Sequence, residues 1–145
     1  MLIIPFLSEE MDLVIKEMPA HKAPGPDGFN GIFLKRCWSL IKEDFYKLAR
    51  DFHDVRFSLE SINASYITLV PKIQCPEEVN DFRPISLTNV CLKFITELAA
   101  NRLQNIILKC LHKNHYGFLK ARSVQYCVSW AFEYLYLRHA SKKSQ

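Results

Sequence analysis

The sequence lacks the features that mark membrane and secreted proteins. Its 145 residues contain no uncharged apolar run of about 18, so no membrane-spanning helix is expected. Residues 1–7 are largely apolar, but no basic segment precedes them, so no secretion signal is expected. The five cysteines are odd in number, widely spaced and without a C-x-x-C pair, which predicts reduced thiols. We therefore expect an intracellular protein of the nucleus or cytoplasm.

The sequence also lacks the motifs of common catalytic centres. No G-x-S-x-G, H-E-x-x-H or P-loop motif occurs. Cys110, His112 and His115 lie close together in the chain, but no fourth ligand accompanies them. No pair of carboxylates stands at strand ends, where a two-metal site would need them. From the residues alone, neither a catalytic residue nor a metal ligand is predicted.

The composition is that of one folded domain with an uneven charge. The chain is 49% hydrophobic and 23% charged, which excludes intrinsic disorder. Residues 1–60 hold 8 Lys and Arg against 10 Asp and Glu, a net −2, whereas residues 61–145 hold 11 against 5, a net +6. The excess lies in residues 109–145. A basic segment favours a phosphate-rich partner, and the alternative is an ordinary solvated surface.

The spacing of apolar residues predicts four helices and one small hairpin. Two short β-rich segments are separated by a polar loop, and Pro84 makes the second an edge strand. Four longer segments have helical periodicity, among them a last helix whose expected buried stripe includes Val124, Val128 and Leu135. We expect a single, helix-rich α+β unit. The predicted helices are 8–18, 30–56, 90–111 and 124–139, and the predicted strands are 65–70 and 82–87.

Two clusters of residues are candidates for binding an anion. In the loop 19–28, Gly25 and Gly28 can bring backbone N–H groups close to phosphate, with Lys22 offsetting the charge of Asp27. The alternative is a rigid connector between two helices, because three prolines and two glycines occupy these ten positions.

Lys72 and Arg83 form the second candidate. Each stands at a strand end beside a proline, so a hairpin would bring the two cations close together. Arg offers bidentate hydrogen bonds and Lys a mobile point charge, a combination that suits a triphosphate. The alternative is plain surface charge, with Arg83 paired to Asp81.

Five segments resemble the reverse transcriptases of LINE-type, non-long-terminal-repeat retrotransposons, especially those of plants. Their order and spacing agree with the family across nearly the whole chain. Ala121 and Tyr126 depart from the family's pattern. The matching segments are His21–Phe29, Ile67–Lys72, Asp81–Val90, Ala100–Leu103 and Tyr116–Phe118.

The resemblance implies a right-hand polymerase fold, of which residues 1–145 would form the fingers and the part leading into the palm. The palm itself would be largely missing. In the family, residues at the positions of Lys72 and Arg83 hold the triphosphate of the incoming nucleotide. The expected partners are therefore an RNA template, a DNA primer and a deoxynucleoside triphosphate. The expected template contacts are Lys22, Pro24, Gly25, Asp27, Gly28 and Arg122.

The resemblance also implies what is not in this sequence. In the family, the motif with the first catalytic aspartate follows shortly after the position of Lys143, and an A-D-D pair follows later; neither motif occurs here. Polymerases use such carboxylates to hold two Mg²⁺ ions, so Mg²⁺ is expected only in the complete enzyme. We expect this chain alone to be inactive. The alternatives are a non-enzymatic nucleic-acid-binding module using residues 109–145 and a functionless, pseudogene-like product with exposed apolar helices.

Overall fold

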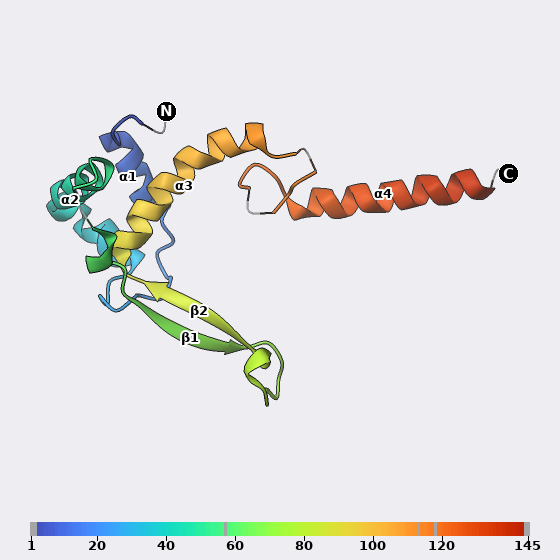
Figure 1. Cartoon of the computed structure of the whole chain (residues 1–145), viewed down its shortest axis with the longest axis horizontal. Coiled ribbons are helices and arrows are strands. Elements are labelled where there is room, and N and C mark those ends of the chain that lie inside the picture. Colours follow the sequence, from blue (N-terminus) through green and yellow to red (C-terminus); the bar gives the residue numbers. More distant parts are fainter. Residues whose placement is uncertain (1–2, 57, 113, 118, 144–145) are drawn as a thin grey trace. The chain divides into compact units, whose positions relative to one another are not determined.

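The fold combines four α-helices with one two-stranded antiparallel sheet (Figure 1). The computed structural model describes residues 3–56, 58–112, 114–117 and 119–143. The chain divides into two compact units, Met1–Ala100 and Asn101–Gln145, with the boundary inside α3. The predicted α+β class is confirmed, whereas the right-hand polymerase identity stays a prediction. The main elements are α1 (Ser8–Glu17), α2 (Gly31–His53), β1 (Ser65–Pro71), β2 (Phe82–Thr88), α3 (Val90–Cys110) and α4 (Val124–Lys143).

The core of the first unit forms where α1, α2 and α3 meet. Phe94, at the centre of this core, is fully buried, and Phe45 of α2 meets its ring edge-to-face at a centroid distance of 5.1 Å. Each such apolar side chain contributes about 1.5–3 kcal/mol to folding. The other large hydrophobic side chains buried here are Met11, Val14, Ile15, Leu34, Tyr46, Val90, Ile95 and Leu98.

The first two helices begin with different capping arrangements. Leu7 occupies the N-cap position of α1, and its N–H donates to Glu10 Oε2 at 3.0 Å. α2 begins after Asn30, whose Oδ1 accepts the Phe33 N–H at 3.1 Å, the usual role of an Asn cap.

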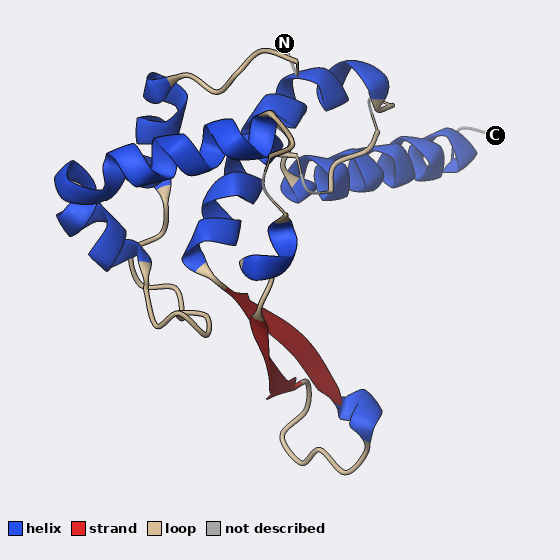
Figure 2. Cartoon of the chain, turned by 60° about the vertical axis from the view of Figure 1, so that its left-hand side comes forward, coloured by secondary structure: helices blue, strands red, loops and turns tan. Residues whose placement is uncertain are grey.

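The predicted hairpin is present and extends away from the three helices of the first unit (Figure 2). β1 and β2 pair from Ser65↔Thr88 to Pro71↔Phe82. Pro84 lies opposite Leu69 on this two-stranded ribbon, where every strand has a free edge that tolerates a proline. Most side chains of both strands are exposed.

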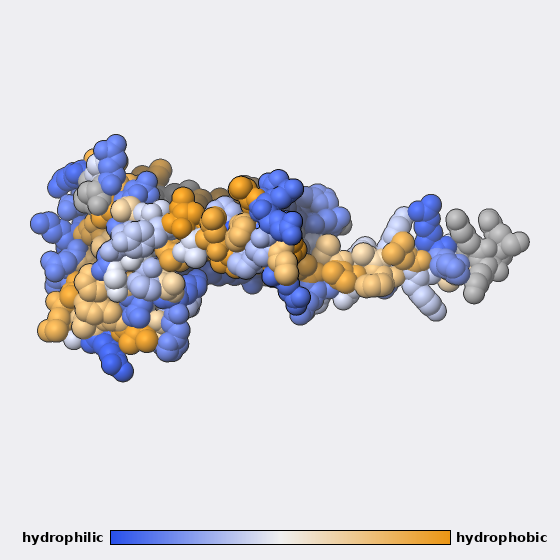
Figure 3. Space-filling view, turned by 90° about the horizontal axis from the view of Figure 1, so that it is seen from below, coloured by the Kyte–Doolittle hydropathy of each residue, from blue (hydrophilic) through white to orange (hydrophobic). Residues whose placement is uncertain are grey.

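The second unit carries α4, whose described side chains are all exposed. The helix starts as predicted after Ser123, whose Oγ accepts the Gln125 N–H at 3.2 Å. The buried stripe expected on Val124, Val128 and Leu135 is wrong, because these residues are 49–61% exposed. Apolar side chains surround the helix instead of forming one stripe, and Figure 3 shows hydrophobic ones on its visible face.

Among the described helices, none has both the length and the apolar character needed to cross a bilayer.

Candidate functional site

The two predicted phosphate-binding cations lie on one face of the hairpin. Arg83 is opposite Val70 in the β-ladder, and the Lys72 N–H donates to the Asp81 carbonyl at 2.7 Å, which continues the same register by one residue. Because side chains two residues apart share a face, Lys72 and Arg83 are diagonal neighbours, a relation in which Cβ atoms lie about 7–8 Å apart or somewhat less. The backbone register thus places Lys72 and Arg83 on one face near the end of the hairpin, and their binding of a phosphate stays a prediction.

Both cations are open to solvent, and the acidic residue beside them is occupied elsewhere. The Lys72 ammonium donates to the Asn80 carbonyl, a neutral acceptor. Asp81 Oδ2 accepts the N–H groups of Glu77 at 3.0 Å and Glu78 at 3.1 Å. Within the part of the chain that the structure describes, Asp81 forms no ion pair with Arg83. The pairing of Arg83 with Asp81 is therefore wrong, while the alternative of plain surface charge stays open for the exposed residues Lys72 and Arg83.

The two faces of the hairpin differ in chemistry. The register places Tyr66, Val70 and Ile85 on the face of the two cations. The opposite face carries only uncharged side chains, among them Ile67 and Leu69. The hairpin thus presents one face with the two cations, Asp81 and an aromatic ring near its base, and one uncharged face.

The loop 19–28 is held against the junction of β2 and α3 by two features. Gly25 is buried, and a Cβ built on it would lie 2.4 Å from the Thr88 carbonyl oxygen, so only glycine allows this approach. Gly28 has φ +73°, a left-handed conformation that favours glycine, and its N–H donates to the Gly25 carbonyl at 3.0 Å. Both glycines thus shape the loop, and the Gly28 N–H is used within the loop, whereas the sequence predicted that it could face a phosphate.

Asp27 joins this loop to the first turn of α3. Its Oδ2 accepts the Val90 N–H, its Oδ1 accepts the Phe29 N–H at 3.2 Å, and its own N–H donates to Asn89 Oδ1 at 3.2 Å. A carboxylate at a helix N-terminus is stabilised by the free N–H groups and by the helix dipole. Among the described residues Asp27 forms no ion pair with Lys22. The backbone, rather than this lysine, offsets its charge.

Sequence reasoning missed two residues that complete this junction. Asn89 donates from Nδ2 to the Ile62 carbonyl at 3.2 Å while its Oδ1 accepts from Asp27, so one amide links three segments. The Lys93 ammonium donates to the Ala23 carbonyl at 3.0 Å. Asn89 directly before a predicted helix is a usual capping residue, but its contact with Asp27, 62 residues earlier, leaves no signal in the sequence. These contacts support the rigid-connector interpretation for Gly25 and Asp27, while Lys22 and Pro24 are exposed.

Arg122, the remaining predicted template contact, belongs to the second unit. Its Nη1 donates to two loop carbonyls, those of His112 at 2.7 Å and His115 at 2.8 Å. The side chain therefore fixes the loop before α4. Phe118, part of one of the matching segments, lies outside the described residues.

Burial and nearby charge perturb one thiol beside the loop junction. Burial raises the pKa of Cys91 at the start of α3, and the negative charge of Asp27 raises this pKa further. Cys91 is thus held as a neutral thiol. The described residues contain no group of three or more His, Cys, Asp and Glu side chains arranged to hold a metal ion, so they do not fit the Mg²⁺ pair of a polymerase.

Comparison with known proteins gives one distant relative. No family model matches the chain. The chain is 24% identical over 121 residues to a protein of Xenopus laevis described as "Transposon TX1 uncharacterized 149 kDa protein". The alignment covers 83% of this chain and 9% of the relative, so the chain corresponds to less than a tenth of that protein. The similarity supports a transposon-derived chain.

Proposed function

We propose that the chain is the fingers portion, with the part leading into the palm, of a reverse transcriptase from a LINE-type retrotransposon. In this role it binds the incoming deoxynucleoside triphosphate and the RNA template beside a DNA primer. The similarity to a transposon protein supports the origin, and the five matching segments support the enzyme class.

The observation that carries the proposal is the shared face of Lys72 and Arg83. Both are solvent-accessible, and the nearby Asp81 carboxylate is directed to backbone N–H groups. A triphosphate offers several anionic oxygens to this face. Arg83 can form two parallel hydrogen bonds with one phosphate while the Lys72 ammonium follows another.

The loop 22–28 supports a template-binding role through its rigidity. Gly25 and Asp27 anchor the loop to the base of the hairpin, and Lys22 and Pro24 are exposed on this anchored loop. A fixed geometry between template and nucleotide contacts is what templated selection of a nucleotide requires. Lys22 would contact the phosphate backbone of the template.

The chemistry of nucleotide addition needs carboxylates that hold two metal ions, and the described residues offer no such group. We therefore propose that binding, and not catalysis, resides in these 145 residues. A primer-extension assay on an RNA template, with Mg²⁺ and with Mn²⁺, should give no product. Product formation by the purified chain would contradict this part of the proposal.

The direct test is nucleotide binding by the purified chain. Replacing either cation, Lys72→Ala or Arg83→Ala, should weaken deoxynucleoside triphosphate binding by about tenfold to a hundredfold, the value of one charge-assisted hydrogen bond. Lys47→Ala, at an exposed position of α2, is the matched control and should bind like the unchanged chain. RNA binding without nucleotide binding would favour the non-enzymatic module instead.

A further inference from the structure

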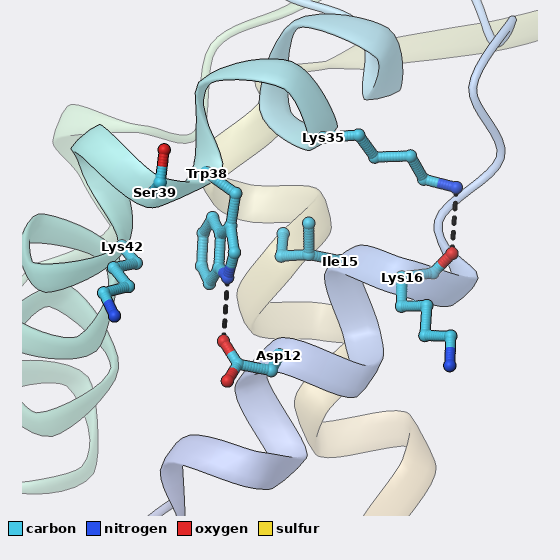
Figure 4. A pocket seen from close by; sticks show the side chains of 7 residues that line it. All are labelled: Asp12, Ile15, Lys16, Lys35, Trp38, Ser39 and Lys42. Atoms are coloured by element: carbon cyan, nitrogen blue, oxygen red, sulfur yellow. Dashed lines mark hydrogen bonds between the residues drawn. The ribbon is translucent and has the colours of Figure 1, made fainter.

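A groove between α1 and α2 combines positive charge with an aromatic wall (Figure 4). Its volume is about 570 Å³, within the range of ligand-binding pockets. Ile15 and Trp38 supply the apolar lining, and Lys16, Lys35 and Lys42 stand around it. The hairpin does not contribute to it.

The charge of the groove contrasts with that of its surroundings. Three lysines and one acidic residue line it, a net +2, although residues 1–60 together carry −2. The one acidic residue, Asp12, is engaged twice: its Oδ1 accepts from Trp38 Nε1 at 2.7 Å and from the Tyr46 hydroxyl at 2.6 Å. The groove thus keeps a net positive charge, although Asp12 interacts electrostatically with Lys42.

The positions of these side chains are set by the two helices. Lys35, Trp38 and Lys42 follow one another at i, i+3 and i+7, so they share one face of α2. Lys35 and Lys42 are about 10 Å apart along the helix axis, from the 1.5 Å rise per residue. Lys35 also donates to the Lys16 carbonyl at 2.8 Å, which fixes its ammonium at the rim. Figure 4 shows Lys35 and Lys42 on opposite sides of the Trp38 ring.

We propose that this groove binds a single-stranded nucleic acid, with phosphates on Lys35 and Lys42 and a base against Trp38. Single-strand binding sites combine cations with aromatic rings, because every base has a π-face. The Trp38 ring is half-buried against the core, so only its uncovered part can meet a base. The axial distance of about 10 Å corresponds to about three phosphate steps of 3.4 Å along a stacked strand. The inference extends the proposed nucleic-acid role to a second site, yet it does not depend on the hairpin.

The test uses the fluorescence of the groove itself. The chain has two tryptophans, so the Trp130→Phe variant leaves Trp38 as the single reporter. Titration with a ten-nucleotide oligo(U) or oligo(dT) at low salt should quench this signal. The double change Lys35→Gln and Lys42→Gln removes the charges but keeps chain length and helix propensity. It should weaken oligonucleotide binding about tenfold or more. The slope of log K against log salt concentration should become shallower by about 1.4, because each of the two lost phosphate contacts contributes about 0.7.

Three comparisons decide the outcome. Lys47→Gln, outside the groove, should leave the titration unchanged. The double variant Lys72→Ala, Arg83→Ala should also leave the oligonucleotide titration unchanged. The groove variants should in turn keep the triphosphate affinity of the parent. Failure of one site can thus be distinguished from failure of the other. A poly-glutamate peptide of ten residues should bind much more weakly than the oligonucleotide. The proposal is overturned if the peptide binds as tightly, if inorganic phosphate alone reproduces the quenching, or if the groove variants bind like the parent.

Discussion

Substitution of Gly25 tests how the loop 22–28 is held. In Gly25→Ala the new Cβ would lie 2.4 Å from the Thr88 carbonyl oxygen and 2.7 Å from the Asn89 nitrogen, both backbone atoms. Ordinary contact begins at 3.4 Å, so the loop must move away by about 1 Å. That movement breaks the Asp27 carboxylate bond to Val90, worth about 1.5–3 kcal/mol, and the Asp27–Asn89 bond, worth about 0.5–1.5 kcal/mol.

The expected loss of unfolding free energy is therefore about 2–4 kcal/mol, measured by urea denaturation of the full chain. Gly28→Ala should lower the unfolding free energy by about 1–2 kcal/mol, because alanine is strained at the left-handed φ of +73° and meets no clash. Gly117→Ala has open space around it and should change stability by no more than about 0.5 kcal/mol. If Gly25→Ala were as stable as Gly117→Ala, the close packing of the loop against the β2–α3 junction would be refuted.

Three further predictions concern a thiol, a carboxylate and an arginine. Alkylation by iodoacetamide at pH 8 should modify Cys91 more slowly than exposed Cys75, because burial and the charge of Asp27 raise the Cys91 pKa; equal rates in a peptide map would contradict this. Hydrogen bonds from Tyr46 and Trp38 lower the pKa of Asp12 below 3.8, so this carboxylate stabilises the fold above that pH and the contribution is lost on further acidification. Acid unfolding of Asp12→Asn should thus be less steep than that of the parent, and identical curves would argue against it. Arg122→Ala removes two hydrogen bonds to loop carbonyls and should speed amide exchange within residues 112–117, whereas unchanged exchange would show that the loop does not need them.

Helices and strands were predictable here because local patterns determine them. β-rich composition and proline placement indicate the hairpin, and its register with the Lys72–Asp81 backbone bond puts Lys72 and Arg83 on one face. The start of α4 at Val124 was likewise predictable from the capping residue Ser123 before it. Local signals do not contain long-range partners, however. Asp27 reads as an exposed turn residue, and only the folded chain shows that it accepts the Val90 N–H across 63 residues.

The prediction of a buried stripe on α4 was wrong for a different reason. Apolar residues occur on every side of this helix, so helical periodicity can be found for one stripe of them whether or not that stripe is buried. The exposed side chains of α4 show that the predicted stripe is not covered. Trp130, Phe132 and Tyr136 are each at least 68% exposed. Such a surface favours association, and the purified chain should form concentration-dependent oligomers in light scattering, reduced by Phe132→Glu. A monomer at all concentrations would contradict this expectation.

The most direct test of the proposed function is how nucleotide affinity depends on the number of phosphates. A deoxynucleoside, its monophosphate and its triphosphate would be titrated calorimetrically into the chain and into the Lys72→Ala, Arg83→Ala double variant. If these two cations hold the triphosphate, affinity should rise with each added phosphate in the chain and stay nearly constant in the double variant. Equal affinity for the three ligands in the unchanged chain, or an unaltered increase in the variant, would contradict nucleotide binding by the hairpin.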